Sequence, residues 1–503
     1  MSTHALRLLP VTIEVNGNAL ADTDQASLGE VRVSQRLSLP AQCELTFFTQ
    51  PATAALAPGA MLRVAVGESL PPLFDGEITA IEHAYEAAQG RRLRVRGYDA
   101  LHRLRKRQPV RAHVQISLAE LARELTSGLG LSVKGPNPDL TWRRLIQHGQ
   151  TDFDFLAQAT EACGLYFSLR GQTLHLVTLE GLGETLRLFL GDTLLEARIE
   201  VNGDPACRMV AADGWDPLRA EEHAGRASQP RVGRSVTAEV PPEQVGGAAE
   251  RTFVHLAVQD DSHAEALAQA ELDLRAAREV VLRGVAEGDP RLQPGARIDI
   301  QGVVPALAGR YVLTEVTHVL DSKQRFVSEL STCPAAPRPR VPGASLVLGK
   351  VTSVEDPDSL GRVQVTLPAC NGVETDWMGV VMVGAGANKG LVMLPDVGDS
   401  VLVLCAHEDP SQGVVLGGLY GTGGPPDGGV ENRSVKRFTC LTPGGQRLRF
   451  DDSKKTIRLE NTDGSFVELG PDKVIFHAKA DLEIEAPGRT VTVRGQTINF
   501  EQG

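Results

Sequence analysis

Two glycine-rich segments are the first candidates for chemistry, because such loops can cradle phosphate groups. Gly384-Ala-Gly-Ala-Asn-Lys-Gly390 follows a predicted strand, but its G-x-G-x-x-x-G spacing differs from the dinucleotide fingerprint. The next residues, Leu391-Val-Met-Leu-Pro395, predict another strand and not the helix whose N-terminus would hold a phosphate. Residues 343–350 resemble a Walker loop with one residue too many, and Val351 stands where Ser or Thr would bind magnesium. We therefore expect plain loops and no nucleotide cofactor.

Metal-binding and nucleophilic residues show no productive spacing either. The 12 histidines contain no H-E-x-x-H motif, and Asp451-Asp-Ser453 lacks the glycine and distal glutamate of a calcium loop. The seven cysteines are scattered without a C-x-x-C pair, which favours buried thiols over disulfides or zinc. No G-x-S-x-G nucleophile elbow occurs. We expect no catalytic residues, no metal and no cofactor, and hence a structural protein and not an enzyme.

The amino-acid composition limits the kinds of partner that the protein can bind and where it can reside. The chain has 503 residues, enough for about three domains. Its 51 basic and 63 acidic residues give a net charge of −12, which argues against a protein that coats nucleic acid or anionic lipid. Residues 1–10 lack the apolar stretch of a signal peptide, and no apolar run is long enough to span a bilayer. We expect assembly in the bacterial cytoplasm and export by another route.

The first two-thirds of the chain predict strands interrupted by short helices. Alternating apolar residues predict strands at 11–15, 31–39, 44–48 and 62–66, a neighbouring pair at 73–81 and 93–98, and later strands at 174–177 and 310–317. A capping box, Ser117 to Glu120, predicts one helix, and Thr151 begins a second. Ser262 to Glu265 predicts the cap of a third helix, which runs to residue 278.

Two breaks rich in proline or glycine divide the rest. Residues 333–343 carry prolines that exclude both helix and ladder. Five strands are then predicted at the spacing of a small closed barrel: residues 346–354, 362–367, 377–383, 400–405 and 414–419. Residues 421–429 form the second break.

The tail after residue 433 has a period of two and no helix period. Apolar residues stand at every second position from Val474 to Ala486, and residues 456–461, 464–469 and 490–500 keep the same alternation. Strands with one dry face and no covering helix must bury that face against other strands. We expect several chains to wrap around one axis here.

The barrel segment resembles a known family, the baseplate-V, or OB-fold, module of phage spikes. The motifs that carry this resemblance are Leu348-Gly-Lys-Val-Thr-Ser-Val-Glu-Asp-Pro-Asp-Ser-Leu-Gly-Arg-Val-Gln-Val365, Met393-Leu-Pro-Asp-Val-Gly-Asp-Ser-Val-Leu-Val403 and His407-Glu-Asp-Pro-Ser-Gln-Gly-Val-Val-Leu-Gly-Gly-Leu-Tyr420. The first 330 residues resemble the late-control-D half of the same spikes through residues 74–81, 95–104, 147–156, 161–167, 294–300 and 308–318. Together they resemble the VgrG-like central spike of contractile injection systems.

This resemblance implies a mainly β protein: two N-terminal barrel-like β domains with a few short helices, an OB-fold barrel, and an intertwined trimeric β-helix needle. The expected domains are a tube-adaptor base at 1–332, linkers at 333–345 and 422–432, an OB-fold at 346–421, and a triangular β-helix at 433–503. It also implies a homotrimer, a hexameric inner tube protein on the base, baseplate proteins, and a target membrane pierced mechanically.

The expected site residues form the needle core and the docking surface for a PAAR-type tip protein: Phe476, Leu482, Ile484, Ile498 and Phe500. Three alternatives stay open, namely a type VI spike that carries an effector, a cell-wall-degrading tail enzyme, and a passive adhesin or tail fibre. The short predicted needle, residues 433–503, favours an extracellular phage-tail-like particle or a phage over the type VI apparatus.

Overall fold

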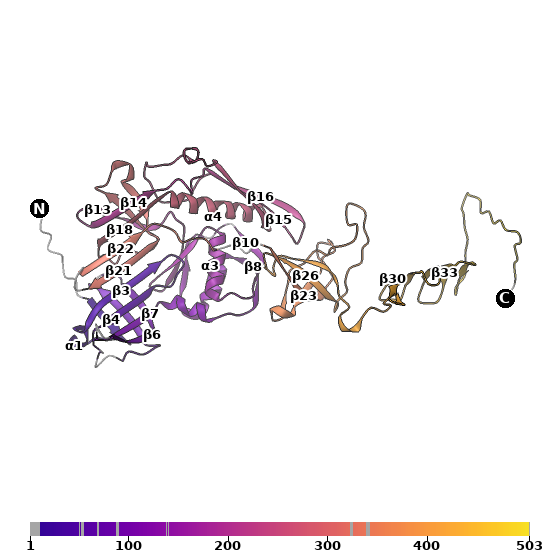
Figure 1. The fold of residues 1–503 in the computed structure, drawn as a ribbon, viewed down its shortest axis with the longest axis horizontal. Coiled ribbons are helices and arrows are strands. Elements are labelled where there is room, and N and C mark those ends of the chain that lie inside the picture. Colours follow the sequence, from indigo (N-terminus) through magenta and orange to yellow (C-terminus); the bar gives the residue numbers. More distant parts are fainter. Residues whose placement is uncertain are drawn as a thin grey trace. The chain divides into compact units, whose positions relative to one another are not determined.

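The computed structural model describes residues 11–49, 51, 55–67, 70–86, 90–136, 138, 140–321, 325–338 and 343–501. The chain forms two units, Met1–Leu419 and Tyr420–Gly503, each described here by itself. As predicted, the protein is mainly β with a few helices (Figure 1). The predicted strands near the N-terminus are present, and the strands that hold residues 73–81 and 93–98 pair with each other as expected.

An eleven-stranded sheet is the framework of the first unit. Its order is β14-β18-β22-β21-β3-β4-β7-β6-β5-β1-β2. The bounds in that order are Leu194–Val201, Val280–Glu287, Arg325–Ser331, Glu315–Asp321, Leu28–Arg36, Gln42–Phe47, Gly90–Tyr98, Phe74–Glu86, Met61–Val66, Val11–Val15 and Asn18–Ala19, with helix α1 at Asp22–Gln25.

Two hydrophobic cores lie along this one sheet. The first gathers side chains of β1 and β3 to β7, such as Val33 and Leu45, and the second gathers side chains of β14, β18, β21 and β22, such as Leu282 and Val316. The two halves of this sheet meet where β3 pairs with β21. This antiparallel ladder places Val33 opposite His318. Residues almost 300 positions apart in the sequence therefore share one ladder.

A helical insertion packs beside the sheet around its own core, which includes Leu121, Leu156 and Phe167. Its elements are η1 Ala100–Lys106, β8 Arg111–Ser117, α2 Leu118–Thr126, η2 Ser127–Leu129, β9 Ser132–Lys134, β10 Thr141–Gln147, α3 Asp152–Ala162, β11 Tyr166–Arg170 and β12 Thr173–Val177. Both predicted caps are confirmed: Ser117 forms the capping box of α2 with Glu120, and the Thr151 hydroxyl accepts from the Asp154 amide at the start of α3.

Helix α4 (Asp261–Glu279) lies on a small sheet of β15 to β17 (Figure 1). The predicted cap at Ser262 is wrong: Asp260 is the N-cap, and its carboxylate accepts from the His263 amide at 2.8 Å. A carboxylate one position before the helix satisfies an orphan amide and favours the positive end of the helix dipole. At Gly225 of β16 any Cβ would lie 2.1 Å from the Glu265 nitrogen, so the close contact with α4 requires glycine.

The remaining elements of this region complete the first two-thirds of the chain. They are β13 Leu182–Phe189, β15 Met209–Asp216, β16 Glu221–Ala227, η3 Pro242–Val245, β17 Glu250–Ala257, β19 Ala296–Gln301, η4 Pro305–Leu307 and β20 Gly309–Val312. The single strand predicted at 310–317 is wrong: the chain leaves β20 after Val312 and enters β21 at Glu315, because the two strands belong to different sheets.

The OB region is a five-stranded sheet in the order β25-β24-β23-β26-β27. The bounds are β23 Ala344–Ser353, β24 Gln364–Leu367, η5 Pro368–Cys370, β25 Val373–Glu374, β26 Ser400–Ala406 and β27 Gly413–Gly418. The strand predicted at 377–383 is wrong: this segment makes isolated bridges through Met378 to Val363 and through Val380 to Val415. The continuation predicted as a strand at 391–395 is also wrong, since these residues join no sheet ladder.

The turn between β23 and β24 is held by a buried ion pair. The Arg362 guanidinium donates to Asp356 at 2.6 and 3.0 Å and to Asp358 at 2.7 Å. Asp356 also accepts from the backbone amides of Leu360 and Arg362. The Arg362 hydrogen bonds hold the pKa of Asp356 well below its usual range.

The second unit begins with η6 Gly421–Gly423 and a hairpin of β28 Val430–Glu431 and β29 Ser434–Val435. An antiparallel meander then follows: β30 Arg437–Leu441, β31 Arg447–Asp451, β32 Thr456–Glu460, β33 Phe466–Leu469 and β34 Val474–His477. The strands predicted beyond residue 477 do not form in the single chain, and their formation between several chains stays a prediction. A strand exists only where another strand completes its hydrogen bonds, and residues 478–486 and 490–500 meet none.

Candidate assembly surface

One face of the meander in the second unit is apolar and uncovered. The strand register places its side chains in two rows: Phe438, Phe450, Ile457, Leu469 and Val474, and beside them Cys440, Leu448, Leu459, Val467 and Phe476. Phe438 is 63% exposed, Leu459 57% and Phe476 70%. A contiguous apolar face of this kind is a mark of a contact surface, whereas single exposed apolar residues are ordinary.

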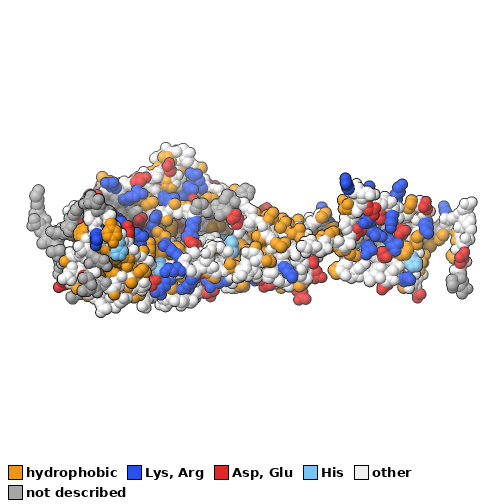
Figure 2. Space-filling model, turned by 60° about the horizontal axis from the view of Figure 1, so that its bottom comes forward, with side chains coloured by type: hydrophobic (Ala, Val, Ile, Leu, Met, Phe, Trp, Pro, Cys, Tyr) orange, Lys and Arg blue, Asp and Glu red, His pale blue; other side chains and the backbone are white. Residues whose placement is uncertain are grey.

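The opposite face of the same meander is polar and internally paired. Arg458 donates to Glu468 at 2.9 Å and to Glu460 at 3.2 Å. The Phe466 ring on this face is covered by the Arg458 guanidinium and stacks on His477 with ring centroids 5.0 Å apart. Figure 2 shows Lys, Arg, Asp and Glu side chains gathered over this unit. This face is already satisfied by solvent and by its own charges, so the apolar face is the one that lacks a partner.

An ion cluster fixes the entry of the chain into the meander. Arg437, the first residue of β30, donates to both carboxylate oxygens of Asp427 and to Glu431. Asp427 also accepts from the Gly429 amide at 2.9 Å and the Thr439 hydroxyl at 3.2 Å. The bonds from Arg437 hold the pKa of Asp427 well below its usual range. The loop before β30 is thereby bound to the polar face.

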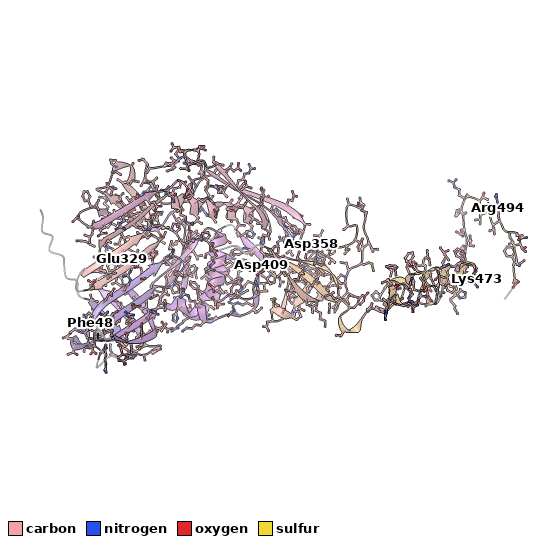
Figure 3. The ribbon with its side chains drawn as sticks, in the orientation of Figure 1. Phe48, Glu329, Asp358, Asp409, Lys473 and Arg494 are labelled. Carbon is pink, nitrogen blue, oxygen red and sulfur yellow. The ribbon has the colours of Figure 1, made fainter. Side chains whose placement is uncertain are left out.

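The five residues predicted for the needle core and tip are not gathered at one place in the single chain. Phe476 lies on the apolar face of the meander, in β34. Leu482 (65% exposed) and Ile484 (72%) lie in the segment without strands, as do Ile498 and Phe500 (94%). Figure 3 labels Arg494 in this segment and Lys473 in the turn before β34. Their assignment to a needle core or a docking surface stays a prediction.

Several residues of the apolar face were not singled out by the sequence reasoning. Phe438 and Cys440 of β30 and Leu448 and Phe450 of β31 extend the face to the start of the meander. The signal was available, because both short strands alternate apolar and polar residues with the same period of two as the strands that follow.

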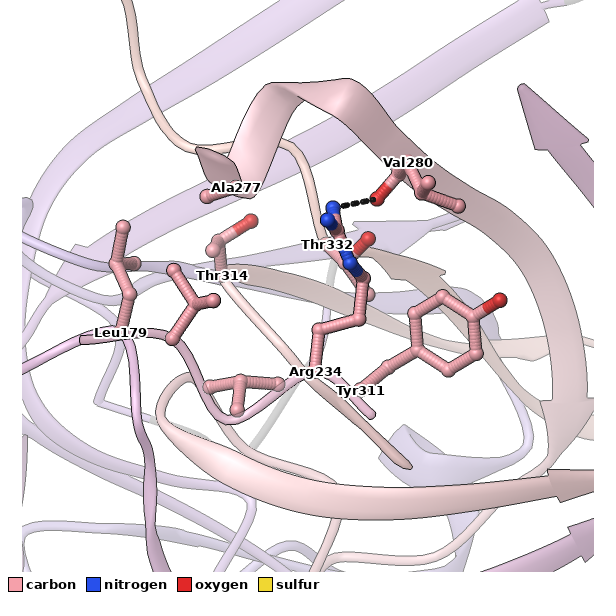
Figure 4. Close-up of a pocket in the computed structure, with 9 residues that line it drawn as sticks. Leu179, Arg234, Ala277, Val280, Tyr311, Thr314 and Thr332 are labelled. Atoms are coloured by element: carbon pink, nitrogen blue, oxygen red, sulfur yellow. Dashed lines mark hydrogen bonds between the residues drawn. The ribbon is translucent and has the colours of Figure 1, made fainter. Parts of the chain in front are cut away.

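Chemical sites are sparse in the described part of the chain. No group of three His, Cys, Asp or Glu side chains among those residues could hold a metal ion. Searched over the same residues, the chain has no helix that is both long and apolar enough to cross a membrane. A cavity of about 20 Å³ lies beside the end of α4, room for one water molecule, and Arg234 donates there to the Val280 carbonyl (Figure 4).

Two family models match this chain. Residues 347–420 match the type VI secretion system/phage-baseplate injector OB domain. Residues 7–322 match the Alg8 N-terminal domain. The first match covers the five-stranded sheet described above, and the second covers most of the eleven-stranded sheet and the helical insertion.

Individual proteins and solved structures are also similar to this chain. The type VI secretion system spike protein VgrG3 of Vibrio cholerae is 23% identical over 257 residues, which is 45% of this chain and 24% of the relative. The chain thus spans about a quarter of the length of this curated relative. Two solved structures share the fold: the Escherichia coli c3393 protein, a type VI secretion component (14% identical, 81% of this chain, 99% of that chain, TM-score 0.54), and the Francisella PdpA–VgrG complex (10%, 94%, 88%, TM-score 0.56).

In its fold and in these matches the chain is similar to VgrG-like spike proteins, as the sequence motifs predicted. The chain belongs to the Alg8 N-terminal domain family, whose model covers more than half of it.

Proposed function

We propose that this protein is the structural central spike of a contractile injection system. The observation that carries the proposal is the uncovered apolar face of the meander, on a chain whose relatives are spike proteins. In this function the protein joins a hexameric inner tube to a needle that sheath contraction drives into the envelope of a target cell. The target membrane is contacted mechanically, and no catalytic step is required.

The apolar face is the reason to propose a homotrimer. A single sheet with one dry face cannot bury that face on itself, and the second unit contains no helix longer than the short η6 among its described residues. Three copies arranged around one axis would bury their three apolar faces against one another and leave their three polar faces in water. The same wrapping would supply strand partners for residues 478–486 and 490–500, which pair with no strand in one chain.

The two cores along one sheet support a role for residues 1–332 as an adaptor to a hexameric tube. Each chain presents two β-rich bodies side by side, joined by the ladder between β3 and β21. Three chains would therefore offer six such bodies in a ring, which is the number that a six-fold tube needs. Baseplate proteins would bind around the outside of this ring.

The needle would resist force because its strands are shared between chains. Unfolding one chain would break main-chain ladders with its neighbours, which favours a slow unfolding rate. The free end of such a needle leaves open strand edges, and a PAAR-type tip protein is the proposed cover.

The experiment that tests the proposal is a mass measurement by light scattering on the purified full-length chain at micromolar concentration. The expected mass is three times 53.8 kDa. A stable monomer would contradict the proposal that this protein is a trimeric spike.

A second reading places the same spike in a type VI secretion apparatus, where it would carry an effector. The identity of the matched relatives favours this reading, since VgrG3 and c3393 are type VI components. Isolating the tagged chain together with its native sheath and tube proteins distinguishes the two, since a free particle contains no membrane-anchored complex. A cell-wall digestion assay on the purified protein tests the remaining alternative, a tail enzyme.

A further inference from the structure

A second apolar surface lies on the OB region, on the side of its sheet that faces away from the barrel core. Strand register places together Leu346 and Leu348 of β23, Leu402 and Leu404 of β26, and Val414 of β27, with Leu416 at the bulge that follows. We call these six residues the outer OB face. Leu346 is 58% exposed and Leu348 49%. The opposite side of the same strands is the buried barrel core, which includes Val403 and Val415.

A hairpin projects from the same region, and we call residues 381–394 the arm. The Leu391 amide donates to Val383 at 3.0 Å, and Gly386 and Lys389 exchange backbone hydrogen bonds at 3.1 and 3.2 Å around a tight turn. Asn388 has a φ of 57°, a left-handed conformation that asparagine tolerates in turns. At its base the Val381 amide donates to the Val415 carbonyl at 2.8 Å, which anchors the arm to the barrel.

The arm is apolar on both of its extended segments. Its exposed side chains include Val383 (77%) and Val392 (76%), together with Val381, Leu391, Met393 and Leu394. Lys389, at the turn, is its one charged residue. A two-stranded hairpin by itself is at best marginally stable in water, so an arm of this composition needs a surface to cover it. Figure 2 shows apolar side chains gathered over this part of the molecule.

The structure assigns the outer OB face as the docking site for the arm of a second copy of this chain. Within one chain the arm does not lie on the outer OB face, because both remain exposed. Every copy supplies one arm and one face of matching apolar chemistry. In a head-to-tail arrangement the arm of each copy covers the outer OB face of the next copy. If the arrangement closes into a ring, every arm and every outer OB face is covered. The arm extends by about six residues from its base, roughly 20 Å at strand spacing, which is enough to reach across the surface of a neighbouring small barrel.

This inference rests on the proposed trimer, because three copies are the number that would close the ring. It adds a specific contact in the OB region, with a direction: residues 381–394 of one copy meet β23, β26 and β27 of the next. It also gives a reason why the parts of two predicted strands that lie in the arm, residues 381–383 and 391–394, form no ladder of their own, since their exposed apolar side chains would be buried against another copy.

Disulfide trapping between differently tagged full-length chains tests the contact. One chain carries Leu348→Cys and the other Val383→Cys, both with Cys440→Ala to remove the exposed native thiol. The two are co-expressed, purified through both tags and oxidised. We expect a covalent heterodimer on a non-reducing gel, because a disulfide requires the two Cα atoms to lie within about 7 Å. The matched control replaces Leu348→Cys with Glu355→Cys, an exposed residue outside the outer OB face, and should give no heterodimer.

Light scattering on the same samples separates this inference from the proposed function. A trimer that cross-links through 348 and 383, and not through 355 and 383, supports the arm contact. A trimer that gives no heterodimer, or equal amounts with both pairs, overturns the arm contact and leaves the spike assignment standing. A monomer overturns the spike assignment, and the closed ring with it.

Discussion

The guanidinium carbon of Arg458 lies 3.7 Å from the centroid of the Phe466 ring, on the face of the meander opposite to Leu459. This contact covers one face of the Phe466 ring on the side of the sheet that carries most of the charged residues. A cation over an aromatic face is attracted by the ring quadrupole, and the two glutamates beside Arg458 balance its charge. The contact therefore gives Phe466 a partner within the chain, whereas Leu459 on the opposite face stays 57% exposed.

Replacing Leu459 by Asp should prevent trimer assembly. The carboxylate would stand in the middle of the apolar face, where burial of an unpaired charge costs several kcal/mol in each copy. Light scattering should report a smaller mass than that of the wild-type protein. The control is Glu468→Gln on the polar face, which removes one partly exposed ion pair and should change stability by no more than about 1 kcal/mol. Equal behaviour of the two variants would mean that the faces are assigned the wrong way round.

Leu482→Asp or Ile484→Asp should disrupt the needle, although both side chains are exposed in the single chain. The proposed wrapping brings equivalent residues of three copies together, so that three carboxylates would share a dry core. Glu483→Gln, at the alternate position, should be close to neutral. Thermal melts of the assembled protein compare the three variants. Similar melting temperatures for Ile484→Asp and Glu483→Gln would show that the register proposed for this segment is incorrect.

Deleting residues 496–503 should abolish co-purification of a tip protein and leave the trimer intact. Ile498 and Phe500 are the apolar side chains that this deletion removes from the described chain, and Phe500 is 94% exposed. The measurement is affinity purification of the tagged spike from cells that also express the tip protein, followed by mass determination. Retention of the tip by the shortened spike would place the docking surface elsewhere.

The base should lose stability in mild acid because of His318. This histidine is fully buried on β21, its Nδ1 lies 2.9 Å from the Ser328 hydroxyl, and burial lowers its pKa to about 4. A histidine in the unfolded chain titrates near pH 6.5. Between pH 6.5 and 4 the unfolded chain therefore binds a proton that the folded chain does not, and the free energy of unfolding falls as the pH falls, by up to about 3 kcal/mol.

Urea unfolding of the full chain at pH 7 and pH 4.5 measures this loss. His318→Gln keeps a hydrogen-bonding side chain without a titrating group, so the variant should show a smaller loss than the wild-type protein. His83→Gln, an exposed position on β6, should show the wild-type loss. If the His318→Gln protein loses as much stability in acid as the wild type, another group governs the acid response.

The sequence by itself determined the features that depend on neighbouring residues. Alternation with a period of two predicts the strands of the base and the meander, and local hydrogen bonding predicts the caps at Ser117 and Thr151. The motifs from 348 to 420 predict the OB region, which the family match confirms. The tail's alternation also predicts an uncovered apolar face, and Phe476 lies on it.

Only the tertiary structure decided the features that depend on residues distant in the sequence. The ladder between β3 and β21 joins Val33 to His318, and no local pattern specifies that pairing. Asp260 and not Ser262 caps α4, because the backbone is still extended at Asp260 (φ −168°, ψ 175°) and the helix already begins at Asp261. Residues 391–394 form the continuous apolar run typical of a buried strand and yet join no ladder. Such a run states which side chains avoid water, whereas a strand also requires a partner backbone within hydrogen-bond distance.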